Sequence, residues 1–148
     1  MHTLFDAGDR ERVLDRIAAL DATRRPLSGR FTAPEMVCHV SIPLRQGLGE
    51  FDAGPPAGPL RYPPLNWLVI HVLPWPKGKA KSPPEYLSVR PTTWASDVGN
   101  LRSLVERFAA RGPDAAWPPH KVFGRISARS WGALQYKHID HHLRQFGV

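Results

Sequence analysis

The sequence has a single cysteine and no long apolar run, and both absences limit what the protein can be. Cys38 has no second cysteine with which to pair, so an internal disulfide is excluded, which suits a reducing compartment. The longest apolar run, residues 65–75, is too short to span a bilayer and contains Pro74. The first thirteen residues lack the long apolar core of a secretion signal. We therefore expect a soluble cytoplasmic protein with no membrane partner.

Acidic residues are the scarcer charged class, with 13 Asp and Glu against 20 Lys and Arg, which leaves a net charge of +7. A basic chain favours anionic partners. The cations are spread over all segments, however, and no expected helix has a basic face interleaved with aromatic residues, so nucleic-acid binding is disfavoured. The one local run of charge, Lys77 to Lys81, is interpreted as a solvated loop, and a clamp on an anionic ligand is the alternative.

The chain also lacks a convincing strand pattern, and its apolar residues instead recur at helical spacing. With 148 residues, 42% of them hydrophobic, it fits one domain covering residues 1–148. We expect four helices. The first is capped by Asp6 or Asp9 and extends to about Ala22, and the others cover about residues 33–51, 93–111 and 128–146.

Two helix starts are marked by capping residues. Thr32 can accept a hydrogen bond from the amide of Glu35, whose side chain reaches back, and Pro34 sits in the first turn, where no amide is needed. Ser127 is the expected cap of the last helix. Between the second and third helices lies a long connection, residues 53–91, that holds ten of the sixteen prolines. Within it, residues 65–73 can form a short helix or a buried turn.

The connection lengths predict the topology. Short links make the first and second helices antiparallel, and likewise the third and fourth, whereas the long connection allows the chain to return along the bundle. The expected fold is an all-α four-helix bundle in up-down-down-up order. The second and last helices then run antiparallel.

Three of the seven histidines lie near the end of the last expected helix. His138 and His142 are four residues apart, about 40° around the axis, so their rings leave one face and can bind one metal ion. No Glu follows His138, so the base of the metalloprotease helix motif is missing. The alternative is that these histidines only complement the C-terminal helix dipole ahead of Gly147.

His39 lies on the apolar stripe of the second helix and needs polar partners if it is buried. A core histidine hydrogen-bonded to a neighbour and a metal ligand are both compatible with that position. In an antiparallel pair, His39 lies at about the same depth as His138 and His142, roughly 6 to 12 Å from one end. This agreement favours a metal site formed by all three histidines.

The segments Trp117 to Gly124 (WPPHKVFG) and His138 to Gly147 (HIDHHLRQFG) resemble an uncharacterised branch of the DinB-like superfamily of metal-binding four-helix bundles. The resemblance covers nearly the whole chain. It implies a divalent metal on His39, His138 and His142. It also implies thiol S-transferase or thiol-dependent maleylpyruvate isomerase activity, with glutathione, mycothiol or bacillithiol. The common branch has Arg-Gly-Gln after the last histidine, whereas this chain has Leu143-Arg144-Gln145.

Three histidines leave a divalent metal at least one open position, as in catalytic sites. We expect zinc, with nickel or manganese as alternatives, and a small-molecule substrate or thiol as the partner. A bound thiolate predicts a thiol transferase and a bound hydroxide predicts a hydrolase, and the lack of a nearby Glu favours the transferase. A non-catalytic metal-binding or ligand-binding bundle is the third reading, and a homodimer is left open.

Five further residues are predicted to surround the metal. His141 lies about 60° from His138 on the side away from His142, so it is expected beside the site and not as a ligand. His120 and Trp117 are expected at the mouth of a pocket, and Gln135 or Tyr136 is expected to orient ligands.

Overall fold

The structure, a computed structural model, describes residues 1–75 and 82–148. Those residues form an all-helical protein without a strand, which confirms the expected class. The α-helices are α1 (Ala7–Ala18), α2 (Ala33–Gly47), α3 (Leu65–His71), α4 (Trp94–Arg111) and α5 (Ala128–Gln145). Two 3-10 turns, η1 (Pro59–Arg61) and η2 (Pro84–Leu87), lie in the long connection.

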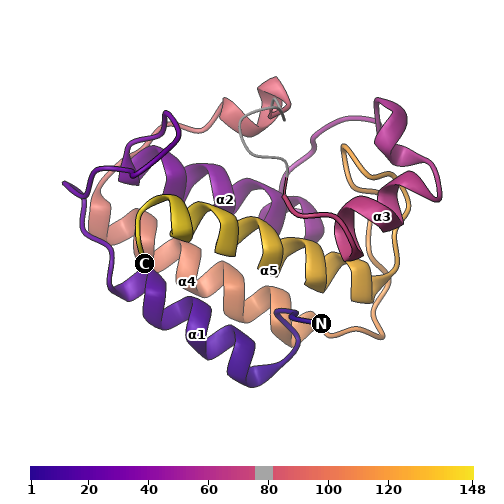
Figure 1. Ribbon diagram of the computed structural model, residues 1–148, viewed down its shortest axis with the longest axis horizontal. Coiled ribbons are helices and arrows are strands. Elements are labelled where there is room, and N and C mark those ends of the chain that lie inside the picture. Colours follow the sequence, from indigo (N-terminus) through magenta and orange to yellow (C-terminus); the bar gives the residue numbers. More distant parts are fainter. Residues whose placement is uncertain (76–81) are drawn as a thin grey trace.

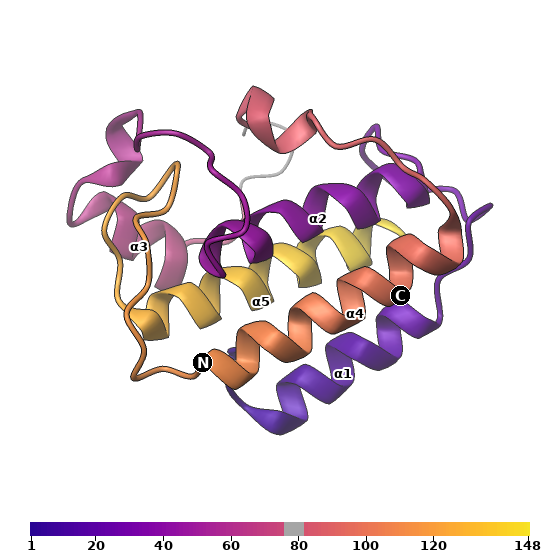
Figure 2. The same ribbon diagram turned by 180° about the vertical axis from the view of Figure 1, so that it is seen from behind.

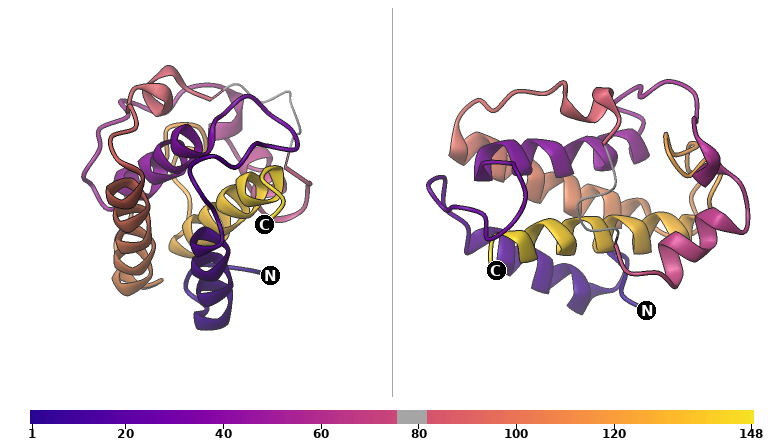
Figure 3. Two further views of the ribbon diagram at one scale, coloured as in Figure 1. Left: turned by 90° about the vertical axis from the view of Figure 1, so that its left-hand side faces the viewer. Right: turned by 45° about the horizontal axis from the view of Figure 1, so that its top comes forward.

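The four long helices pack against one another, and the left view of Figure 3 looks at them from one end of the molecule. α1 and α5 run in one direction, because Leu4 donates to the carbonyl of Gly132 near one end and Arg16 contacts Asp140 near the other. α2 runs opposite to α5, and α4 runs with α2 (Figures 1 and 2). The antiparallel α2 and α5 place the first half of α2 beside the last turns of α5.

The helix starts follow the capping signals in the sequence. Thr32 and Glu35 form the expected capping box, and the side chains of Asp6 and Ser127 cap α1 and α5. The first two helices end about four residues earlier than predicted. α1 ends because the amide of Leu20 closes a tighter turn on Ile17 and its side chain enters the core. α2 ends before Gly49, whose positive φ of 79° breaks the helix.

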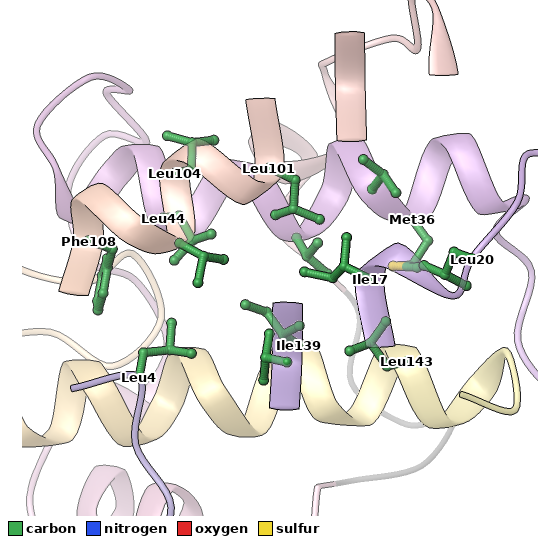
Figure 4. Close-up of a cluster of buried hydrophobic side chains, with 14 of the residues drawn as sticks. Leu4, Ile17, Leu20, Met36, Leu44, Leu101, Leu104, Phe108, Ile139 and Leu143 are labelled. Carbon is green, nitrogen blue, oxygen red and sulfur yellow. The ribbon is translucent and has the colours of Figure 1, made fainter. Parts of the chain in front are cut away.

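The main core is formed by apolar side chains from all four long helices and from Leu4 (Figure 4). Its largest fully buried members are Trp131 of α5, Phe108 of α4 and Phe146, which follows α5. Burying aromatic and aliphatic side chains of this size supplies much of the stability of a small domain. The core therefore packs α2 against α5.

A second, smaller apolar cluster lies where α3 packs against the first half of α5. Lys137 of α5 fixes that contact, because its ammonium donates to the carbonyls of Val69 and Ile70 at 2.7 and 3.1 Å and also to Leu73. Of the two alternatives for residues 65–73, a short helix or a buried turn, the structure has the helix, α3. The basic run Lys77 to Lys81 lies outside the described residues. No described helix is both long and apolar enough to cross a membrane.

Candidate metal centre

Three buried histidines from two helices meet beside the long connection. His39 comes from α2, and His138 and His142 come from α5. One ring nitrogen of each lies within 4.8 Å of one from each of the others, and the ring centroids are 4.8 to 5.0 Å apart. The structure therefore brings together the three residues that the spacing and depth argument selected.

Hydrogen bonds fix the orientation of two of the rings. His39 donates from Nδ1 to the carbonyl oxygen of Tyr86 at 3.2 Å, because a carbonyl can only accept. His142 donates from Nδ1 to Oε1 of Gln145 at 2.8 Å. In a neutral ring the proton on Nδ1 leaves a lone pair on Nε2. Both bonds therefore present Nε2 as a metal-binding atom, in the way that outer partners orient histidine ligands.

The three imidazoles are neutral near pH 7. Burial lowers the pKa of His39, and burial together with the neighbouring histidines lowers the pKa of His138 well below its usual value. Burial, with a smaller contribution from His39, lowers the pKa of His142 to about 3. A protonated imidazole cannot bind a metal, so these shifts keep all three rings in the form that can.

The geometry fits a divalent ion. The Nε2 atoms of His39 and His138 are 3.2 Å apart. Two nitrogens held about 2.0 to 2.1 Å from a tetrahedral ion would be about 3.3 Å apart. The same distance also suits an N–H···N hydrogen bond from His138 to His39, which is the core-histidine alternative. A hydrogen bond between His138 and His39 accounts for only two of the three rings. It gives no reason for His142 to converge on the same point, whereas a metal ion does.

A cavity of about 250 Å³ lies against the three histidines. Trp75 stacks on His138 with ring centroids 5.3 Å apart, and Phe31 stacks on His39 at 4.8 Å. These aromatic rings shield the imidazoles from water at their faces, while the cavity gives a small molecule access to the point where they converge.

Three of the other predicted site residues line this cavity: His120, Gln135 and His141. His141 packs against Trp75 at 5.8 Å and does not belong to the group of convergent nitrogens. His120 accepts from the amides of Val122 and Phe123 at Nδ1, at 3.0 and 3.3 Å, so its proton is on Nε2. His120 therefore presents an N–H donor, 3.5 Å from the hydroxyl of Tyr86.

The structure places the remaining two predicted residues away from the cavity. Trp117, expected at its mouth, packs in the main core against Phe108, with ring centroids 4.5 Å apart. Tyr136, expected to orient ligands, stacks on His2 at 5.0 Å. The reason is helical geometry, because Tyr136 is about 100° around α5 from Gln135 and so faces the N-terminal segment.

Four residues with clear contacts to the histidines were not predicted: Phe31, Trp75, Tyr86 and Gln145. Three of them lie in connections, where no periodic pattern indicates which side chain turns inward. Gln145 could have been found, because it lies three residues after His142 on the same helix face.

The described residues form an all-helical fold in which three histidines converge beside a cavity. The protein is therefore a helical protein with a candidate metal centre. Residues 8–147 match the model of a family described as a protein of unknown function (DUF1569), and the chain belongs to that family. No curated protein matches the chain, and no solved structure matches it either.

Proposed function

We propose that the protein binds a divalent metal ion, zinc first, through Nε2 of His39, His138 and His142, and uses it in the reaction of a low-molecular-weight thiol. The observation that carries this proposal is the convergence of three buried, neutral imidazoles at a cavity. Burying three polar rings at one point is costly unless each finds a partner, and one ion would serve all three.

A divalent ion in this position supplies Lewis acidity, which lowers the pKa of a bound thiol or water. The chain's own residues hold and shield the site. Tyr86 and Gln145 orient the ligating rings, and Phe31 and Trp75 exclude water from their faces. His120 also lines the cavity, and its N–H lies beside the hydroxyl of Tyr86, another lining residue.

A thiol is favoured over water as the nucleophile because no Asp or Glu is among the described residues that line the cavity. Activating water usually requires a general base, and His120, one of the two lining imidazoles outside the triad, has its Nδ1 occupied by backbone amides. A thiol loses its proton to solvent more readily and then attacks without further help. Its sulfur forms a bond to an electrophilic carbon, and the displaced group leaves with the electrons of the broken bond.

The resemblance to DinB-like proteins supports the same function, since thiol S-transferases occur among them and the HxxxH pair matches. The substrate class does not transfer with it, because Leu143-Arg144-Gln145 replaces the usual Arg-Gly-Gln. Gln145 nevertheless lies where it accepts the Nδ1 proton of His142. His142 therefore keeps a polar partner, although the three residues after it differ from the usual Arg-Gly-Gln.

The experiment combines metal analysis with a thiol screen. The purified protein should contain about one equivalent of metal, and glutathione, mycothiol or bacillithiol should shift its melting temperature only in the metal-loaded form. A responding thiol should then be conjugated to a small electrophile in a metal-dependent assay. A protein that takes up no metal after loading would refute the proposal. Metal-dependent ester or amide hydrolysis without any response to thiols would instead indicate the hydrolase reading.

A further inference from the structure

The side chain of Gln135 is the most unusual polar group in the cavity. It is fully buried, with 0% of its surface exposed, and neither its amide oxygen nor its amide nitrogen has a hydrogen-bond partner among the described residues. Buried side-chain amides are almost always paired, because an unpaired donor or acceptor loses its bonds to water without compensation. Selection for folding alone would favour Leu or Met at this position.

Gln135 lies close to the proposed metal. It is three residues before His138 on α5, so the two side chains leave the same helix face about one turn apart, and both line the cavity. Val69, Phe123 and Leu134 are among the apolar residues that line the same cavity. A ligand in the cavity can therefore meet the Gln135 amide together with apolar side chains and the convergent histidines.

We infer that Gln135 forms a substrate subsite for a small, largely apolar molecule that carries a primary carboxamide. The inference rests on the proposed function, since it treats the cavity as the substrate site of the metal centre. A carboxamide presents a carbonyl to the amide nitrogen of Gln135 and an N–H to its amide oxygen, so both unpaired atoms are satisfied together.

Other small ligands satisfy the subsite less well. A ketone or an ester accepts from the amide nitrogen but leaves the oxygen of Gln135 without a donor, and a hydrocarbon leaves both atoms unpaired. A site built to form hydrogen bonds discriminates strongly against an analogue that lacks one of them, because its own polar group then stays buried and unpaired. The cavity of about 250 Å³ limits the molecule to roughly the size of a substituted aromatic ring.

The test compares benzamide with acetophenone, which is nearly the same size and keeps the carbonyl but lacks the N–H. Dissociation constants are measured by calorimetry on the metal-loaded protein. Benzamide should bind about tenfold or more tightly than acetophenone. In Gln135→Leu the ratio should fall to about one while the metal content stays unchanged, because Gln135 is not a ligand.

Gln46→Leu is the matched control. It removes another buried amide, one that bonds to Tyr86 and to the carbonyl of Pro119 and does not line the cavity. Gln46→Leu should lower the melting temperature and keep the preference for benzamide. Gln135→Leu should lose that preference without a lower melting temperature.

Equal affinity for the two molecules in the native protein, binding of neither, or a preference that survives Gln135→Leu would overturn the subsite. Loss of the preference in Gln46→Leu would also overturn it, because the discrimination would then not be specific to the Gln135 amide. In each of these outcomes the protein would still contain its metal, so the metal proposal would stand. Conversely, a protein that binds no metal but still prefers benzamide through Gln135 would refute the metal proposal and leave the subsite intact.

Discussion

Nε2 of His39 lies 3.2 Å from Nε2 of His138, although the two residues are 99 positions apart in the sequence. They come from helices that run in opposite directions and are held together by the main core. α2 and α5 also share many apolar side chains of this core, so the packing of the two helices does not rest on the histidines alone. We therefore expect the protein to stay folded without metal and to gain stability when metal binds.

That gain should be visible in thermal unfolding. An ion that binds only the folded state stabilises it by mass action, by about 2.7 kcal/mol at a free concentration one hundred times the dissociation constant. Zinc should raise the melting temperature of the native protein, and the increase should disappear in His142→Ala. An equal melting temperature with zinc and with chelator in the native protein would argue that the histidines serve only as core residues.

Gln145 should tune the metal site without being a ligand. Gln145→Leu removes the acceptor of the Nδ1 proton of His142, which frees the ring to rotate and lowers its basicity. The loss of such an outer partner typically weakens metal affinity about 10 to 100-fold. The neighbouring Arg144→Ala, at an exposed position on the opposite side, is the control and should leave the affinity close to native. Competition with a chromogenic chelator measures both, and equal affinities would show that the bond to Gln145 has no role.

The sequence predicted the parts of this site that depend on periodicity. His138 and His142 follow from the pitch of one helix, and His39 follows from the capping box at Thr32, which fixes where α2 begins. The similar depth of the three histidines in the bundle was then predicted by counting residues along two antiparallel helices. Each of these steps depends on local rules that hold almost everywhere in helical proteins.

The cavity wall could not be predicted in the same way. Trp75 and Tyr86 lie in the proline-rich connection, where the path of the chain depends on contacts with α2 and α5 and not on a repeating pattern. Trp117 was expected at the mouth together with His120. It instead fills the core beside Phe108, since two aromatic rings bury more apolar surface there.

His120 should make the protein sensitive to acid. Burial lowers its pKa to about 3, far below the usual value of 6.5, so the folded state disfavours its protonated form. In the unfolded chain His120 takes up a proton below about pH 6.5, so stability falls as the pH drops from about 6.5 toward 3. The slope from this residue is on the order of 1 kcal/mol per pH unit.

His120→Asn tests this, because its amide oxygen can replace Nδ1 as the acceptor of the two backbone amides but does not titrate. Urea unfolding of the chelated protein at pH 7, 6 and 5 should show a shallower loss of stability in the variant. Parallel profiles for the two proteins would contradict a neutral, buried His120.

Two helical glycines should respond to alanine in opposite ways. A Cβ on Gly132 of α5 would lie 2.4 Å from the hydroxyl of Thr3 and 2.6 Å from the ring of Phe5, so Gly132→Ala must displace the N-terminal segment. We expect a loss of roughly 1 to 3 kcal/mol. A Cβ on Gly99 of α4 meets nothing within 4 Å, so Gly99→Ala should stabilise the protein by roughly 0.5 to 1 kcal/mol. Urea unfolding of both variants measures the difference, and a stabilising Gly132→Ala would mean that the N-terminal segment does not pack on α5.

The most direct test of the metal centre is the metal content of His39→Ala and His141→Ala, loaded side by side with zinc and measured after gel filtration. His39 is one of the three convergent ligands, whereas His141 lines the same cavity outside that group. We predict that His39→Ala loses stoichiometric zinc while remaining helical, and that His141→Ala keeps about one equivalent. Full occupancy in His39→Ala, or loss of zinc in His141→Ala, would contradict the assignment of the three ligands.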